Sequence, residues 1–261
     1  MTTQSQSSYD YSVYWQPGCS SCLRTKEFLT KHGIQYNSIN VQEDNDAFDN
    51  LSRLGARSIP VVTRGEEFVY AQDIDVLADF LGIPQTRQVL TFEVLLEKLD
   101  LLLLAAQRYL RQMPDELMSN SLPGRDRNYS DLAYHIFVIP LAFLDAVSGQ
   151  ELSYAYFERR PPKSISTISG LISYGDEIRK KLESWQVSTT QTTMPDSVLT
   201  YYGQHSTHSV LERTAWHTAQ HVRQLMELLD KHKIEVDEPL GDRELAGLPL
   251  PDEVYDDEID L

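Results

Sequence analysis

Short apolar runs alternate with helical periods over the first third of the chain, and glycine or proline separates them. The runs have the aromatic, β-branched or alternating pattern of strands. The predicted strands cover residues 11–15, 35–41, 59–62 and 66–70. The predicted helices cover residues 19–32, 44–54 and 74–81. This order predicts a compact βαβαββα domain, with its boundaries at residues 9–84.

A longer period begins at Val89 and changes the predicted fold class. Apolar side chains recur at i, i+3, i+4 and i+7 over residues 90–113, a pattern typical of an amphipathic helix. Further helical periods cover residues 130–147, 165–184 and 205–232. Long helices in this number favour an all-α four-helix bundle over residues 88–233. The fold prediction is therefore an α/β domain followed by a helical bundle.

The last 28 residues have neither period. Residues 234–261 carry 1 basic and 11 acidic side chains, so they hold −10 of the net charge of −16. The remaining charge is −5 over residues 1–84 and −1 over residues 85–233. Blocks of like charge are usually solvated. The sequence therefore predicts an acidic, irregular, solvent-exposed C-terminal tail.

Composition excludes several classes of function. Hydrophobic residues make up 41% of the 261 residues, which is enough to bury a core. The net charge of −16 argues against binding nucleic acid or an anionic membrane surface. No run of 18 apolar residues predicts a membrane span, and the first ten residues lack the features of a signal peptide. A cytoplasmic location is expected.

The two cysteines, Cys19 and Cys22, form a C-x-x-C motif between the first predicted strand and helix. Unpaired backbone N–H groups and the helix dipole favour a thiolate at that turn. Cys22 would lie one turn further on, where it can attack a mixed disulfide formed on Cys19. In a βαβ setting this motif indicates thiol–disulfide exchange.

Residues 11–83 resemble a glutaredoxin, and within that superfamily the NrdH and mycoredoxin branch. The resemblance rests on YWQPGCSSC at 14–22 and on SIP at 58–60. It implies a thioredoxin fold in which Cys19 is the nucleophile, Cys22 resolves the mixed disulfide, and a cis Pro60 faces both. Of the family's Gly-Gly-x-Asp glutathione signature, only Asp73 is present. Pro60 and Asp73 are therefore the candidate substrate-positioning residues.

Three histidines form a candidate metal site in the helical half. His217 and His221 are four residues apart, so they lie on one face of the last long helix. His135 lies on another predicted helix, and apolar residues flank all three. Three imidazoles leave an open coordination position, an arrangement suited to zinc, nickel or iron. The other histidines of this half, His205, His208 and His232, lie near predicted helix ends.

Residues 90–233 resemble the DinB/YfiT superfamily, with DLAYHI at 131–136 and TAWHTAQHVRQL at 214–225 carrying the likeness. The resemblance implies a divalent metal on His135, His217 and His221. Members of known activity use low-molecular-weight thiols, whose pKa a metal lowers. Further residues are candidates to bind the carboxylates of such a thiol: Arg125, Arg127, Tyr134 and Arg223. By analogy, a homodimer through the bundle is expected.

The leading hypothesis is a metal-dependent transferase or isomerase that uses a low-molecular-weight thiol, first of all glutathione, with an electrophilic or disulfide substrate. The fused dithiol would resolve a mixed disulfide or reduce the product. One alternative is a non-catalytic metal or redox sensor. Another is a dithiol disulfide reductase whose helical bundle docks protein partners.

Overall fold

A computed structural model of the chain describes residues 9–124, 126–189 and 194–256. The chain divides into two compact units. Unit 1 contains the chain up to Thr86 together with a segment that begins at Pro251, and unit 2 covers Arg87–Leu250. Each unit is described by itself.

Unit 1 has a mixed sheet within residues 9–86, with strand order β2-β1-β3-β4. Strand β1 is parallel to β2 and antiparallel to β3, and β4 is antiparallel to β3. The strands are β1 (Tyr11–Trp15), β2 (Tyr36–Asn40), β3 (Val61–Arg64) and β4 (Glu67–Tyr70). The helices are α1 (Ser20–Lys31), α2 (Ala47–Leu54) and α3 (Ile74–Leu81). The predicted βαβαββα order is confirmed, as is a thioredoxin-like α/β domain at the N-terminus.

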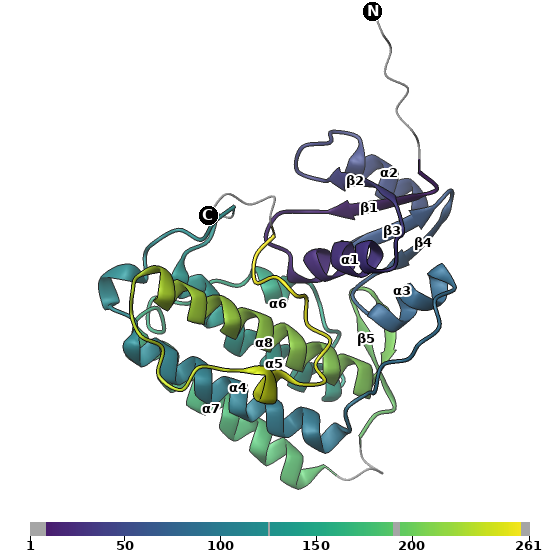
Figure 1. Cartoon of the computed structure of the whole chain (residues 1–261). Helices are drawn as coiled ribbons and strands as arrows, with labels where there is room; N and C mark the ends of the chain where they lie inside the picture. The colour runs from purple at the N-terminus through teal and green to yellow at the C-terminus, as the bar shows by residue number, and fades with distance from the viewer. Residues whose placement is uncertain (1–8, 125, 190–193, 257–261) are drawn as a thin grey trace, which may run out of the picture. The chain divides into compact units, whose positions relative to one another are not determined.

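The side chains of β1 point alternately to the two faces of the sheet, so unit 1 has an apolar cluster on each face. Val13 and Trp15 pack with residues of α1 and α3, whereas Tyr14 packs on the other face with residues of α2. Helices α1 and α3 therefore cover one face of the sheet, and α2 covers the other (Figure 1). Gly55 and Gly82 end α2 and α3 in the left-handed conformation that favours glycine.

Unit 2 is largely helical. Within the part of residues 87–250 that the structure describes, the long helices are α4 (Phe92–Gln112), α5 (Tyr129–Val147), α7 (Ile168–Ser188) and α8 (Thr207–Lys231). Short elements join or follow them: η1 (Asp115–Leu117), α6 (Ala155–Glu158) and α9 (Asp242–Leu245). Helix α8 packs on α4 and α5, and α7 packs on both of these as well. The predicted helical segments are confirmed within a few residues at each end, while the four-helix bundle stays a prediction.

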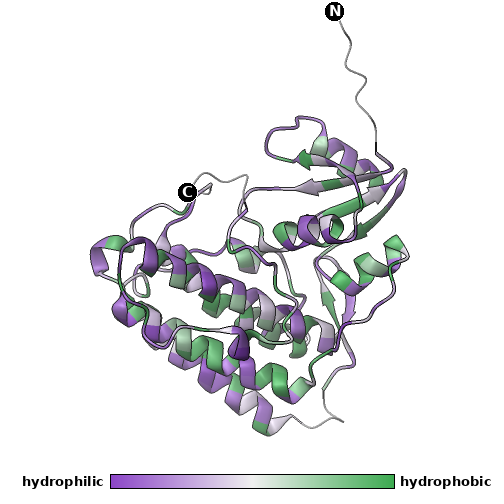
Figure 2. Ribbon diagram, in the orientation of Figure 1, coloured by the Kyte–Doolittle hydropathy of each residue, from purple (hydrophilic) through white to green (hydrophobic). Residues whose placement is uncertain are grey.

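Helix α5 is long and apolar enough to cross a membrane, by length and composition alone. Unit 2 buries 89% of this segment, so its apolar character is that of a core helix. Figure 2 shows apolar residues along its ribbon among the other long helices of the unit. The sequence predicted a helix here, but no run of 18 apolar residues, because Asp131, Tyr134 and His135 interrupt the apolar stretch.

The predictions for unit 2 lack its strand hairpin as well as its short helices. Strands β5 (Ser197–Thr200) and β6 (Gly203–Ser206) form an antiparallel hairpin. Their polar, four-residue segments give a period-2 pattern too short to detect, and the helix predicted from residue 205 begins only at Thr207. The correction moves His205 from a helix end to a strand.

The C-terminal residues that the structure describes, up to Asp256, are not a freely solvated tail. In unit 2, Arg108 of α4 donates hydrogen bonds to the carbonyl oxygens of Asp237 and Glu238, at 2.9 and 2.6 Å. The Tyr109 hydroxyl donates to the same Glu238 oxygen and accepts from the N–H of Leu240, both at 3.0 Å. The backbone of this segment therefore packs along α4, while its carboxylates supply the negative charge.

In unit 1, the segment from Pro251 packs on α1. The ammonium group of Lys26 pairs with the carboxylate of Asp256 at 2.6 Å, and both side chains are about nine-tenths buried. The same ammonium lies 3.8 Å from the centroid of the Trp15 ring. Glu27 accepts the N–H groups of Asp252 and Glu253, at 2.6 and 2.9 Å. These contacts correct the prediction of an exposed tail for residues 251–256.

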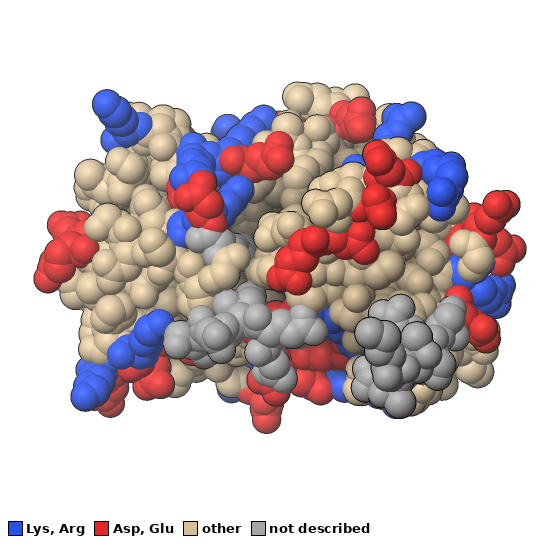
Figure 3. All heavy atoms as spheres, turned by 90° about the horizontal axis from the view of Figure 1, so that it is seen from above, with Lys and Arg blue, Asp and Glu red and all other residues tan. Residues whose placement is uncertain are grey.

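Among the described residues on the face drawn in Figure 3, acidic and basic side chains are interspersed with uncharged surface. Exposed charges in each unit include close pairs, such as Arg64 with Glu67 in unit 1 and Arg160 with Asp126 in unit 2. Such exposed pairs contribute little to stability. The buried pair between Lys26 and Asp256 instead joins α1 to the segment from Pro251.

We expect Asp256→Asn to lower the free energy of unfolding by about 1.5–3 kcal/mol, because the buried Lys26 ammonium loses its charged hydrogen-bond partner. Denaturant unfolding, followed by tryptophan fluorescence, measures the change. Asp252→Asn is the matched control. It removes the ion pair with Lys31, whose side chains are more than half exposed, and should cost less than about 1 kcal/mol. Equal effects of the two variants would contradict a structural role for the buried pair.

Candidate functional site

The two cysteines lie at the start of α1, where the turn after β1 places them. Cys19 is the N-cap residue, and the N–H of Cys22 points to its sulfur at 3.2 Å. The Cα atoms are 5.1 Å apart, and the sulfurs form a disulfide. In the reduced protein, the same N–H group and the dipole of α1 would favour the thiolate of Cys19.

The surroundings expose one cysteine more than the other. Cys22 is fully buried against Val13, Trp15 and Leu29, whereas Cys19 is partly exposed. Only Cys19 is therefore open to a substrate disulfide. The position of each cysteine agrees with the roles that the resemblance implies, the nucleophile outside and the resolving thiol beneath it.

The peptide bond between Ile59 and Pro60 is cis, which confirms the expected conformation. Ile59 packs against the core cluster that contains Cys22, so the bend before β3 lies beside the dithiol. The carbonyl oxygen of Ile59 accepts a hydrogen bond from the buried amide of Gln72 at 2.7 Å. Gln72 itself accepts at its backbone oxygen from Arg24 at 2.7 Å.

Asp73 has a local structural role. It is the N-cap of α3, and its carboxylate accepts the N–H of Asp75 at 3.0 Å. An N-cap carboxylate stabilises the start of a helix. The structure therefore explains why an aspartate stands here, while its part in positioning a substrate stays a prediction.

The three predicted histidines come together in unit 2. His135 on α5 and His217 and His221 on α8 are all buried, and one ligand nitrogen from each lies within 4.8 Å of the other two. The Nε2 atoms of His217 and His221 are 3.0 Å apart. Zinc–nitrogen bonds of about 2.0–2.1 Å place tetrahedral ligand nitrogens about 3.3 Å apart. The cluster therefore fits a small divalent cation with three imidazole ligands.

Gln224 orients one of these rings. Its side-chain oxygen lies 2.7 Å from Nδ1 of His221, and an amide oxygen only accepts hydrogen bonds. Nδ1 of His221 must therefore carry the proton, which leaves Nε2 with its lone pair directed at the cluster. A partner of this kind fixes the tautomer and orientation of metal-binding histidines.

Of the four candidates for binding carboxylates, the three that the structure describes each have a partner within unit 2. Arg125 lies outside the described residues. Arg127 donates to the backbone oxygen of Phe157 at 2.6 Å, and Arg223 donates to Gln220 at 2.7 Å. Tyr134 stacks on Tyr174, with ring centroids 5.1 Å apart. Burial raises the pKa of Tyr174 well above its ordinary value, so that phenol stays neutral.

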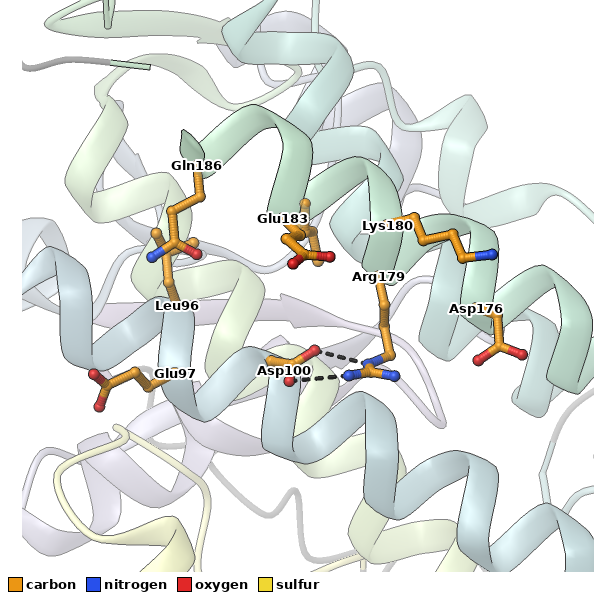
Figure 4. Close-up of a pocket in the computed structure, with 9 residues that line it drawn as sticks. Leu96, Glu97, Asp100, Asp176, Arg179, Lys180, Glu183 and Gln186 are labelled. Atoms are coloured by element: carbon orange, nitrogen blue, oxygen red, sulfur yellow. Dashed lines mark hydrogen bonds and ion pairs between the residues drawn. The ribbon is translucent and has the colours of Figure 1, made fainter. Parts of the chain in front are cut away.

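A groove between α4 and α7, about 550 Å³ in volume, is separate from these clusters (Figure 4). Its wall is charged, but Asp100 and Arg179 face each other across it and pair at 2.7 Å. None of the three clustered histidines is among the residues that line it. The groove shows no arrangement of groups that indicates a reaction.

Sequence reasoning overlooked three residues beside the histidine cluster: Arg213, Gln224 and Phe157. Arg213 and Gln224 were detectable, because they lie on α8 four residues before His217 and three after His221. Phe157 comes from the short helix α6, and its ring lies 5.7 Å from the rings of both His135 and His217. No pattern in the sequence predicts that the ring of Phe157 lies at this site.

Comparison with known proteins gives a family for the N-terminal part of the chain. A family model described as Glutaredoxin matches residues 11–69. The Gene 56 protein of Mycobacterium phage L5 is 35% identical over 80 residues, which cover 29% of this chain and 78% of the phage protein. The glutaredoxin-like protein NrdH of Lactococcus lactis subsp. cremoris (strain MG1363) is 30% identical over 60 residues, 23% of this chain and 82% of its own.

A solved structure also matches. The crystal structure of a mutant of the thioredoxin-like protein BC3987 is 32% identical, with a TM-score of 0.28. The match covers 29% of this chain and 97% of that one.

Proposed function

Because the chain belongs to the glutaredoxin family through its N-terminal domain, we propose that it is a thiol–disulfide oxidoreductase that works through Cys19 and Cys22. The observation that carries this proposal is the position of Cys19, partly exposed at the N-terminus of α1 with a backbone N–H directed at its sulfur. Small disulfides and thiols are the substrate class that the family acts on.

The reaction proceeds in two exchanges. The Cys19 thiolate attacks one sulfur of a substrate disulfide, forms a mixed disulfide and releases the other half as a thiolate. Cys22 then loses its proton and attacks the Cys19 sulfur, which releases the second half. Two electrons pass from the dithiol to the substrate, and the protein is left with the Cys19–Cys22 disulfide that the structure contains.

Pro60 and Asp73 are proposed to position the substrate. The cis bond before Pro60 lies beside the core that holds Cys22, which supports a role for this bend as one wall of the site. Where the family has the second glycine and the variable residue of its glutathione signature, this chain has Ala71 and the buried Gln72. Glutathione is therefore proposed as a substrate of the helical unit rather than as a ligand of the redox domain.

A second function is proposed for unit 2, where His135, His217 and His221 hold a divalent metal, zinc first, with nickel or iron as alternatives. The clustered, buried nitrogens support this proposal. When bound, the metal would lower the pKa of a thiol in its open position. The residues of the chain would orient the ligands and exclude water. A low-molecular-weight thiol such as glutathione would then react with an electrophile, as a transferase or isomerase requires.

Two alternatives differ in what the helical unit does. A sensor would bind the metal but no thiol, and a plain reductase would use the unit to dock partners and bind no metal. Deleting unit 2 and the residues after it is a poor test, because it would also remove Asp256 from Lys26 in unit 1. Metal analysis and thiol titration of the full chain separate the three functions. A homodimer through the helices stays a prediction.

The redox proposal predicts different thiol stoichiometries for the two cysteine variants. The pre-reduced wild type, mixed with excess bis(2-hydroxyethyl) disulfide, should release two thiols per protein. Cys22→Ser should release one and retain a mixed disulfide visible by mass spectrometry, whereas Cys19→Ser should do neither. Ser20→Ala, which keeps both cysteines, is the control and should match the wild type. A mixed disulfide on Cys19→Ser would show that Cys19 is not the nucleophile.

The metal proposal predicts that the full chain binds one divalent ion and that His135→Ala, His217→Ala and His221→Ala each lose it. Gln224→Leu should weaken metal affinity about 10–100-fold, because His221 loses the partner that fixes its tautomer. His205→Ala, on β6, is the control. Elemental analysis and competition with a chelating dye give the affinities. Full metal content in all three alanine variants would overturn the site.

The transferase proposal predicts turnover of glutathione with 1-chloro-2,4-dinitrobenzene by the metal-loaded chain. Each of the three alanine variants should lose this activity while disulfide exchange at Cys19 and Cys22 continues. A chain that binds metal but shows no affinity for any thiol would favour the sensor.

A further inference from the structure

Arg213 lies one helical turn before the histidine pair. The spacing of Arg213, His217 and His221 is i, i+4 and i+8, so all three lie on one face of α8. Arg213 is only 6% exposed, which is unusual for a residue with a permanent charge. This face of α8 therefore carries a buried cation next to the candidate metal ligands.

Aromatic rings surround the guanidinium group. Its central carbon lies 5.3 Å from the ring centroids of Phe157 and Tyr202, and 5.7 Å from that of Tyr201. One terminal nitrogen donates a hydrogen bond to the Tyr201 hydroxyl at 2.8 Å. The Phe157 ring is also 5.7 Å from the ring of His217. Phe157 is thus a wall shared by the guanidinium and the histidine cluster.

The buried charge of Arg213 has no counter-ion within the described part of the chain. The ion pairs found there join other residues, and Nε of Arg213 has no hydrogen-bond partner among the described residues. The neighbouring carboxylate on α8, Glu212, pairs with Arg87 instead, at 2.6 Å. A buried cation is costly unless it is paired and hydrogen-bonded. The guanidinium therefore has N–H donors available to an anion that enters the site.

We infer that Arg213 binds the carboxylate of the small molecule that reaches the histidine cluster. The planar fork of a guanidinium matches a carboxylate in a bidentate arrangement, and the aromatic walls exclude water from the pair. The substrate class is a thiol that bears a carboxylate, with its sulfur at the metal and its carboxylate at Arg213. The sulfur end of this inference rests on the proposed metal site, whereas the carboxylate end does not.

The test compares two thiols that differ in one group. The full chain is loaded with Co²⁺, and mercaptoacetate and 2-mercaptoethanol are titrated against the cobalt–thiolate absorption. The wild type should bind mercaptoacetate about 10-fold more tightly, as expected for a charged hydrogen bond. Arg213→Gln should lose this preference while its Kd for 2-mercaptoethanol is unchanged. A preference that survives in Arg213→Gln shows chelation by the metal alone and overturns the inference.

Two further variants keep the test independent of folding. Arg213→Lys retains the charge but not the fork and should keep part of the preference, while Arg179→Gln, on α7, should behave as the wild type. If the chain binds no Co²⁺, the proposed metal site fails, but Arg213 is still tested. Mercaptoacetate should then raise the Tm of the metal-free wild type but not of Arg213→Gln. No rise in the wild type would overturn the inference.

Discussion

Buried polar groups need a hydrogen bond, a metal or an opposite charge, and helix α8 carries several such groups in the helical unit. Its buried face carries Arg213, His217 and His221 in successive turns. A face of this kind cannot pack as an ordinary apolar core, because each desolvated group needs a hydrogen bond, a metal or a counter-ion. Gln224 and Tyr201 meet part of that need. A metal at the histidines and a carboxylate at Arg213 are the further partners that we propose for this face.

The redox domain also buries polar groups, and two of them have partners within the chain that lie close to the dithiol. The amide of Gln72 is buried and bonds to the Ile59 carbonyl, which holds the bend before the cis Pro60 beside the dithiol. The ammonium of Lys26 lies on α1 one turn beyond Cys22 and is paired with Asp256. Of the two cysteines, Cys22 is fully buried and Cys19 is partly exposed, which is why the proposed reaction begins at Cys19.

Local patterns predicted the elements that depend on local physics. Helix α4 could be predicted because its apolar period extends over about six turns, and the dithiol because a C-x-x-C motif between a strand and a helix has few other uses. The same reasoning failed where a partner is distant in sequence. The acidic tail was predicted to be solvent-exposed, because no residue close to Asp256 in the sequence indicates a contact with Lys26, which is 230 residues away. Phe157 was overlooked for the same reason, since the short helix α6 brings its ring to histidines on two other helices.

The pair between Lys26 and Asp256 also bears on how far the family resemblance extends. An alignment of 80 residues to the phage relative cannot contain both partners, so the pair is absent from the matched segment. In a domain that ended near residue 84, Lys26 would lie beside the Trp15 ring without this carboxylate. The redox domain of this chain is therefore completed by residues that follow the helical unit. Since the segment from Pro251 belongs to unit 1 and pairs with α1, the fold of the redox domain uses residues from both sides of unit 2 in the sequence.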